Sequence, residues 1–180
     1  TPNWRTLEVQ DVAFQHSGGL CQGMRIGTSQ DGVMAEYYIV NDVEMNTAHI
    51  PDGVSLENAL MVSDMMTTGF HGVELADVQF GDTVVVIGTG PVGLMAVVAA
   101  KLRGAGRIIA VGSRAKCREL AIHYGASNVV NYKDGDIYAQ IMELTGGKRV
   151  DRTVIAGGGT EQLPIAYKLT RPGGGIGDLV

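Results

Sequence analysis

The amino-acid sequence predicts an α/β fold built on a parallel sheet from about residue 82 onward. Three observations support this prediction. Apolar, β-branched runs alternate with helical stretches, and the connections between them are short. In addition, 26 of the 180 residues are glycine, which suits a fold with many tight turns. Strands that alternate with helices across short loops form a doubly wound parallel sheet, with helices on both faces.

The elements of this region follow one another in a regular order. Strands are expected at 83–88, 107–112, 128–132 and 150–156, and helices at 91–103, 115–124, 136–145 and 161–170. Gly173 to Gly175 then open a further strand. Because a doubly wound nucleotide-binding sheet normally has about six strands, we expect this sheet to be incomplete at its C-terminus.

Residues before 82 have a different character. Short β signals, clearest from Val33 to Val40, are broken by Gly, Asn, Asp and Pro up to about residue 52. A helical region is expected from Ser55 to about Ala76, because Ser55 and Asn58 suit a helix start. Gly69 and Gly72 weaken the helical pattern. The sequence therefore predicts two parts that differ in architecture.

The most informative segment joins the strand at 83–88 to the helix that follows it. It reads Thr-Val-Val-Val-Ile-Gly-Thr-Gly-Pro-Val-Gly and contains G-x-G-x-x-G between a strand and a helix, the context that binds a dinucleotide. The first glycine permits the turn, the second lets the backbone approach a pyrophosphate, and the third allows close helix packing. A glycine-rich turn in another α/β protein is the alternative. The predicted cofactor-binding residues of this turn are Gly88, Thr89, Gly90, Pro91, Val92 and Gly93.

The end of the next strand indicates which dinucleotide is bound. An NAD-preferring site carries Asp or Glu about 20 residues past the glycines, where the acid binds the ribose 2′-OH. Here that place holds Gly112, Ser113 and Arg114, and the nearest carboxylate is Glu119. Glycine leaves room for a 2′-phosphate, serine can donate to it, and arginine can make a charge-assisted contact. The sequence favours NADP over NAD, although an ordinary polar loop with a solvated arginine remains the alternative.

Composition and charge exclude several classes of protein. The formal net charge is −5 and the Lys and Arg residues form no block, so nothing favours a nucleic-acid partner. No apolar run approaches the length of a membrane span, and no signal peptide is recognisable. Cys21 and Cys117 are too few and too far apart for a disulfide framework or a closed zinc site. We expect a cytoplasmic protein with no membrane partner.

Four segments together resemble the zinc-containing medium-chain alcohol dehydrogenases, in their NADP-dependent secondary-alcohol branch. They are Ser-Asp-Met-Met-Thr-Thr-Gly-Phe-His-Gly (63–72), Val-Ile-Gly-Thr-Gly-Pro-Val-Gly-Leu-Met (86–95), Ala-Val-Gly-Ser-Arg (110–114) and Val-Asn-Tyr-Lys-Asp-Gly (130–135). The resemblance implies part of a β-rich GroES-like catalytic domain over 1–66 and a Rossmann NADP-binding domain over 67–180. It also implies an enzyme, usually a tetramer, that interconverts small secondary alcohols and ketones with NADP(H) and one catalytic zinc.

The resemblance assigns roles to individual residues. Asp64 falls where the branch has a zinc-binding carboxylate, and Thr68 matches a residue beside the nicotinamide; both are the expected catalytic residues. Tyr132 matches a tyrosine beside the adenosine phosphate. Met24 stands where a pocket tryptophan is expected, which leaves the substrate preference open. By its spacing alone, Asp64 would instead be a solvated or capping carboxylate near a helix start, and the resemblance reverses this preference.

The enzymes of this branch are much longer than 180 residues. Their other zinc ligands, a Cys and a His followed by Glu, would precede this chain, and His16 and Cys21 do not match them. We therefore expect the 180 residues alone to be inactive. Two other kinds of function stay open: a zinc-free NADP-dependent reductase or non-catalytic NADP-binding module, and, ranked last, a methyltransferase. Methyltransferases usually keep a carboxylate at the end of the second strand.

Overall fold

The computed structural model describes residues 30–40, 43 and 47–180. The chain divides into two compact units, Thr1–Thr67 and Thr68–Val180, and each is described by itself. His16, Cys21 and Met24, which the sequence analysis considered, lie outside the described residues. So does most of the β-rich region expected before residue 52.

The first unit contains a helical segment that begins where the sequence predicts. Helix α3 (Leu56–Met61) starts at Ser55, whose hydroxyl accepts a hydrogen bond from the N–H of Asn58 at 3.2 Å. A π-helical turn, η1 (Val62–Met66), follows directly. The strand expected within 33–40 was wrong: these residues are irregular. A strand is stable only when it is paired, and no described residue forms a ladder with this segment.

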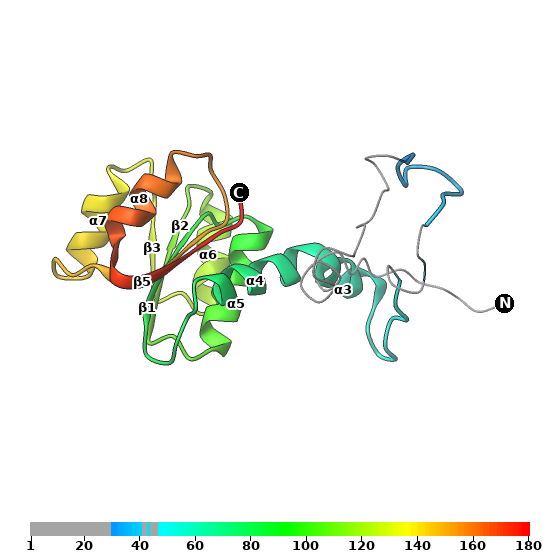
Figure 1. Ribbon diagram of the computed structural model, residues 1–180, viewed down its shortest axis with the longest axis horizontal. Helices are drawn as coiled ribbons and strands as arrows, with labels where there is room; N and C mark the ends of the chain where they lie inside the picture. The colour runs from blue at the N-terminus through cyan, green and yellow to red at the C-terminus, as the bar shows by residue number, and fades with distance from the viewer. Residues whose placement is uncertain (1–29, 41–42, 44–46) are drawn as a thin grey trace. The chain divides into compact units, whose positions relative to one another are not determined.

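The second unit is a five-stranded parallel sheet in the order β3-β2-β1-β4-β5 (Figure 1). The predicted alternation of strands and helices is confirmed. The strands are β1 (Thr83–Ile87), β2 (Arg107–Val111), β3 (Asn128–Val130), β4 (Val150–Ile155) and β5 (Thr170–Asp178). The helices are α4 (Thr67–Leu75), α5 (Pro91–Leu102), α6 (Ala115–Tyr124), α7 (Ile137–Leu144) and α8 (Gln162–Leu169).

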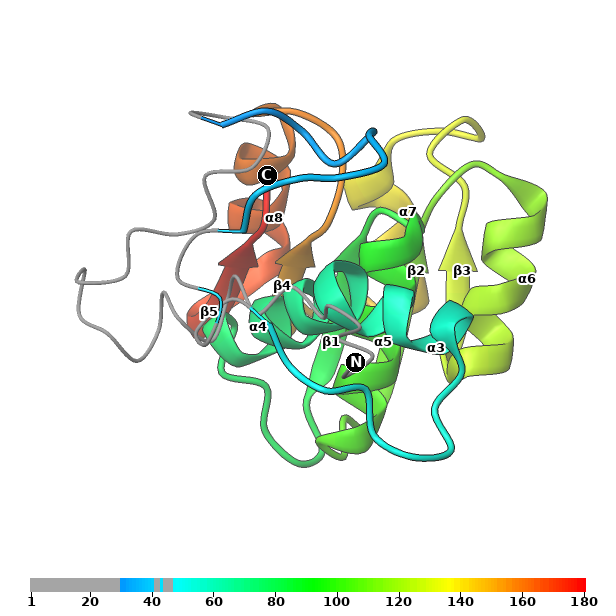
Figure 2. The same cartoon turned by 90° about the vertical axis from the view of Figure 1, so that its right-hand side faces the viewer.

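Helices cover both faces of the sheet (Figures 1 and 2). Because side chains alternate along a strand, Val84 and Val86 of β1 enter one core together with α4, α5 and α6. Val85 and Ile87 enter a second core with α7 and α8. The chain leaves β1 for β2 on one side and reaches β4 on the other. This reversal opens a crevice at the carboxyl ends of the strands, where ligands bind in such sheets.

Strand β5 begins earlier than expected and meets α4 without intervening side chains. It starts at Thr170, immediately after α8, and its register with β4 shifts between Val150 and Arg152. A Cβ atom at Gly177 would overlap the carbonyl oxygen of Gly72 in α4. The glycines that weaken the helical pattern in the sequence are therefore positions of close packing. We call this backbone contact between α4 and β5 the glycine seam.

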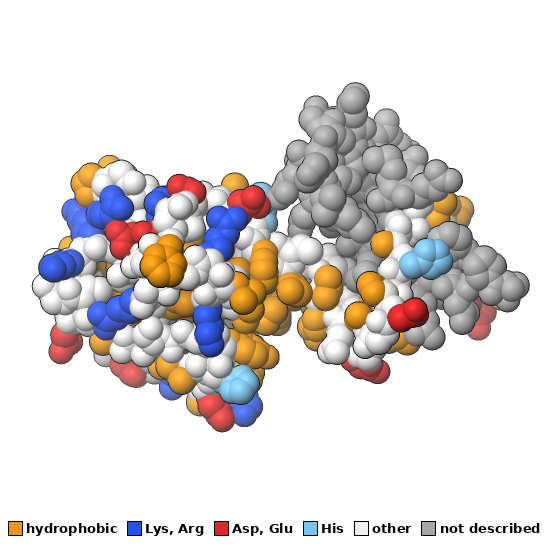
Figure 3. All heavy atoms as spheres, turned by 90° about the horizontal axis from the view of Figure 1, so that it is seen from below, with side chains coloured by type: hydrophobic (Ala, Val, Ile, Leu, Met, Phe, Trp, Pro, Cys, Tyr) orange, Lys and Arg blue, Asp and Glu red, His pale blue; other side chains and the backbone are white. Residues whose placement is uncertain are grey.

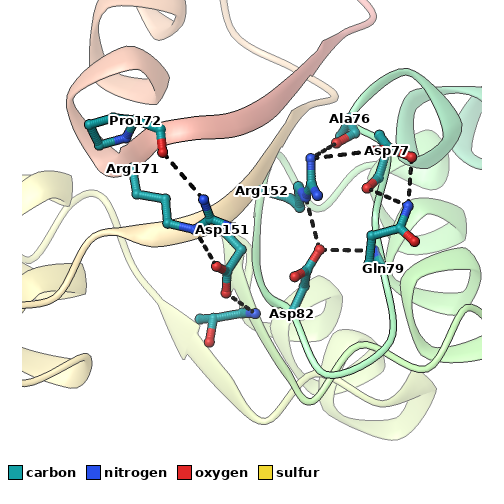
Figure 4. A network of polar contacts seen from close by, with 9 residues as sticks. Ala76, Asp77, Gln79, Asp82, Asp151, Arg152, Arg171 and Pro172 are labelled. Carbon is teal, nitrogen blue, oxygen red and sulfur yellow. Dashed lines mark hydrogen bonds and ion pairs between the residues drawn. The ribbon is translucent and has the colours of Figure 1, made fainter.

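Two groups of polar contacts join the strands at their amino ends (Figure 4). The guanidinium of Arg152 pairs with Asp82 at 2.8 Å and also donates to the carbonyl of Ala76 at 3.2 Å. Asp151 accepts from Arg171 at 2.6 Å and from the backbone N–H of Thr83 at 2.8 Å. These contacts hold the ends of β1, β4 and β5 together on the side of the sheet opposite the crevice.

The surface of the second unit carries mixed charges. Figure 3 shows Lys and Arg side chains interspersed with acidic, apolar and uncharged ones. Within the described residues, every helix is too short or too polar to cross a membrane.

Candidate functional site

The glycine turn between β1 and α5 has the geometry that its sequence predicts. Gly88 has a φ of 104°, which favours glycine, and a Cβ there would lie 2.8 Å from the carbonyl oxygen of Ala156. A Cβ at Gly93 would overlap the carbonyl oxygen of Gly88, so α5 packs directly on the turn. At Gly90 the space is open, with the guanidinium of Arg114 as its nearest neighbour at 3.7 Å. The turn is tight on its inner side and open at Gly90.

Helix α5 begins at this turn with its first N–H groups available. Gly90 is the N-cap and provides no side chain to accept from them, and Pro91 occupies the first helical position. The N-terminus of a helix favours anions because its N–H groups and its dipole both point toward the ligand. The local geometry therefore fits a phosphate group.

The end of β2 provides the polar side chains of the site. The hydroxyl of Ser113 donates to the phenolic oxygen of Tyr132 at 2.9 Å, which joins the loops after β2 and β3. Arg114 is exposed, and its guanidinium extends toward Gly90. Gly112 differs from the expectation in one respect. The space that its missing side chain leaves is filled by Thr89, whose hydroxyl a Cβ at residue 112 would overlap.

These groups line one pocket of about 610 Å³ at the carboxyl ends of β1, β2 and β4. Ligand pockets commonly have volumes of about 300–1,000 Å³. Pro91, Val92 and Gly93 form the turn but are not among the lining residues. The predicted residues that the structure brings together in the pocket are Gly88, Thr89, Gly90, Gly112, Ser113, Arg114 and Tyr132.

Sequence reasoning missed part of the pocket wall. Asp136, Glu161 and Gln162 also line it. Asp136 caps α7, since its carboxylate accepts from the N–H of Ala139 at 2.8 Å. Hydrogen bonds from the backbone N–H groups of Glu161 itself and of Gly159 lower the pKa of Glu161, which keeps this rim carboxylate ionised. Asp136 and Glu161 follow β3 and β4 in the chain, each just before a helix, and this position was the one signal in the sequence that could have found them.

Asp64 and Thr68 are not among the residues of this pocket. Asp64 is exposed on η1 in the first unit, whereas Thr68 belongs to α4 in the second unit. Within the described residues, no three His, Cys, Asp or Glu side chains gather so that they could hold a metal ion. The described donors therefore do not make up a zinc site, and the assignment of Asp64 as a ligand stays a prediction.

The fold and the pocket at its switch point define a Rossmann-like α/β protein, and comparison with known proteins narrows this class. Residues 91–177 match the family described as zinc-binding dehydrogenase. The chain is 57% identical to the NADP-dependent isopropanol dehydrogenase of Thermoanaerobacter brockii over 179 residues, which are 99% of this chain and 51% of that relative. The chain belongs to the zinc-binding dehydrogenase family, as the resemblance in the sequence indicates.

Solved structures of dehydrogenases share the fold. A zinc-dependent alcohol dehydrogenase from Streptococcus pneumonia matches with a TM-score of 0.75 and 30% identity, over 83% of this chain and 43% of that one. A zinc-binding dehydrogenase from Sinorhizobium meliloti, described as putative and bound to NADP, matches with a TM-score of 0.64 and 28% identity, over 72% and 38% of the two chains. The chain thus spans about half the length of the curated relative it matches.

Proposed function

We propose that this protein interconverts small secondary alcohols and ketones by hydride transfer with NADP(H). The choice of NADP rests on one observation at the end of β2. Gly112, Ser113 and Arg114 line the pocket there, at the place where an NAD-preferring site has an acid. An acid there would repel a 2′-phosphate, whereas the Ser113 hydroxyl and the Arg114 guanidinium can bind one. The relative from Thermoanaerobacter brockii is named for NADP and isopropanol, which supports the same choice of cofactor and substrate class.

The residues of the second unit would hold NADP in a defined order. The turn at Gly88 to Gly90 and the first N–H groups of α5 would bind the pyrophosphate. Ser113, Arg114 and Tyr132 would bind the adenosine end. The bound cofactor would supply the hydride chemistry, and the protein would fix its orientation and exclude water around it. Thr68 is proposed to lie beside the nicotinamide.

The remaining assignments rest on the resemblance. We propose residues 1–66 as part of the catalytic domain and 67–180 as the NADP-binding domain. Asp64 is proposed as one ligand of a catalytic zinc. One carboxylate alone does not make a zinc site, because such a site needs at least three protein ligands. A homotetramer in the cytoplasm is the expected state of the enzyme.

The cofactor assignment is tested by binding and by turnover. Calorimetry should show tighter binding of NADPH than of NADH, and NADPH oxidation with acetone or butanone should exceed NADH oxidation. Arg114→Met should weaken NADPH binding by about 1.5–3 kcal/mol, because a charge-assisted hydrogen bond is lost. Arg149→Met removes an exposed arginine outside the pocket and is the matched control. Equal affinity of the unmutated protein for NADPH and NADH would contradict the proposal.

The metal assignment has a separate test. Elemental analysis of the active enzyme should find about one zinc per chain, and Asp64→Ala should lose it. Glu57→Ala, which removes an exposed carboxylate from the neighbouring helix α3, should retain the metal. Turnover with no zinc present would instead support the zinc-free reductase.

A further inference from the structure

Arg118 makes an unusual contact behind the loop that carries Ser113 and Arg114. It lies in α6, and its guanidinium folds back so that Nη1 donates to the carbonyl oxygen of Ser113 at 2.5 Å. The same atom lies 3.5 Å from the carbonyl oxygen of Gly112. Arg118 is partly buried and is not among the residues that line the pocket, although the loop it contacts is. Its guanidinium therefore supports the loop from the side away from the pocket.

This contact fixes the direction of two peptide groups. The N–H and C=O of a trans peptide point in opposite directions. When Arg118 holds the carbonyls of Gly112 and Ser113, the N–H groups of Ser113 and Arg114 face away from it, toward the pocket side. Neither N–H donates to another residue in the described part of the chain. Successive N–H groups that point to one side form a concavity that binds anions.

The charge of Arg118 acts in the same direction. None of the ion pairs found among the described residues includes Arg118. Its neighbours Lys116 and Glu119 pair with each other at 3.1 Å. A positive charge held on carbonyl oxygens directly behind the loop attracts an anion in front of it, since partly buried charges are weakly screened by salt.

We propose that Arg118 is a positioning residue that selects nucleotides carrying a 2′-phosphate. It does so by orienting the N–H groups and side chains of Ser113 and Arg114 without touching the nucleotide itself. This inference rests on the proposed NADP function and extends it from the residues of the pocket to one behind it. The selection concerns the 2′-phosphate alone, because the pyrophosphate turn at Gly88 to Gly90 makes no hydrogen bond with Arg118.

The test compares two nucleotides that differ by the 2′-phosphate. Calorimetry measures the affinity of the protein for 2′,5′-ADP and for 5′-ADP, in the unmutated form and in Arg118→Met. This substitution removes the guanidinium but retains an unbranched side chain. We expect the affinity for 2′,5′-ADP to fall about tenfold and that for 5′-ADP to change less than about twofold. Arg118→Lys should recover part of the loss, because it keeps the charge but not the planar fork. Lys116→Met, which removes a charge two residues away in the same helix, is the control and should leave both affinities within about twofold.

Each outcome decides a separate point. Equal losses for both nucleotides, or no loss for either, would overturn the role of Arg118 while leaving the NADP preference intact. If the unmutated protein binds 5′-ADP as tightly as 2′,5′-ADP, the proposed NADP function itself fails, and this inference fails with it. Thermal unfolding without nucleotide shows whether Arg118→Met is folded. If it is not, the comparison of Arg118→Lys with the unmutated protein decides, and an unchanged ratio of the two affinities in that variant overturns the proposal.

Discussion

Thr89 determines which residues the chain tolerates at position 112. It is almost completely buried in the turn after β1, and its hydroxyl fills the space beside Gly112. The two residues belong to the ends of adjacent strands, so a side chain added to one must displace the other. An acid introduced at residue 112 to favour NAD would therefore meet Thr89 before it meets the ribose.

We predict that Gly112→Ala destabilises the protein by about 1–3 kcal/mol, the usual cost of overpacking. Thr89→Gly in the same chain should restore part of this stability, because it removes the atoms that the new Cβ overlaps. A double-mutant cycle in urea measures the coupling. Gly157→Ala is the control, since a Cβ there would have its nearest neighbour at 3.7 Å. Additive effects of the two substitutions would show that residues 89 and 112 do not compete for this space.

At the residue scale, the sequence predicted the residues that line the pocket. It did not predict the residue that holds the pocket loop from behind. Gly88, Gly90 and Ser113 could be found because a motif fixes their spacing along the chain. Arg118 could not, because its partners are carbonyl oxygens that no sequence pattern displays. The pairing of Asp151 with Arg171 is hidden for a similar reason: the two residues are 20 positions apart and meet only after β4 and β5 have paired.

At the scale of the elements, Asp151 joins three strands by its carboxylate. Burial by itself raises the pKa of Asp151, but the hydrogen bonds from Arg171 and from the N–H of Thr83 outweigh it, so the pKa lies below its usual range. The carboxylate therefore stabilises the folded state when it is ionised. This contribution is fully present above the unfolded pKa of about 3.9 and is lost as the pH falls through the lower folded pKa.

Stability should consequently decline with acid below about pH 4–5, in part through this group. Asp151→Asn should be less stable than the unmutated protein at neutral pH and should lose less stability on acidification. Urea unfolding at a series of pH values measures both. Asp134→Asn, an exposed carboxylate in the loop after β3, provides the control. An identical acid dependence in Asp151→Asn and the unmutated protein would assign the decline to other carboxylates.

The glycine seam between α4 and β5 provides a second test at the scale of the elements. Gly177→Ala should destabilise the protein by about 1–3 kcal/mol or more, because its Cβ would overlap a backbone oxygen that cannot rotate away. Gly32→Ala adds the same atom where no other atom lies within 4 Å and should change stability little. The midpoint of thermal unfolding compares the two. A Gly177→Ala protein as stable as Gly32→Ala would show that α4 and β5 can separate without cost.

The elements of the second unit could be predicted because each has a local signal. β-branched runs gave β1, β2 and β4, and the helices followed from their apolar periodicity. The segment 33–40 has the same β signal but forms no ladder with a described strand, and pairing is not encoded locally. Gly69 and Gly72 were interpreted as helix weakeners because propensity describes an isolated helix. In the fold, Gly69 lets α5 approach, and Gly72 leaves room for the side chains of Leu179 and Val154.

At the scale of the whole molecule, nucleotide binding should act on one unit. All residues of the pocket belong to Thr68–Val180. With 2′,5′-ADP at 100 times its dissociation constant, this unit should gain about 2.7 kcal/mol of stability by mass action. Hydrogen exchange should show the strongest protection near 87–90, 111–114 and 156–158. Residues 47–60 of the first unit should exchange at unchanged rates and serve as an internal control. Equal protection in both ranges would show that the nucleotide site extends beyond the pocket.

The glycine seam also has a mechanical consequence. Side chains between two elements normally absorb small displacements by changing rotamer, but the seam consists of main-chain atoms with no such freedom. A shift of β5 must therefore reach α4 without attenuation, and the helix moves with the sheet as one body. Thr68 in the first turn of α4 and the nucleotide pocket at the strand ends consequently share a single rigid frame. The link between them is the main-chain contact of the seam itself.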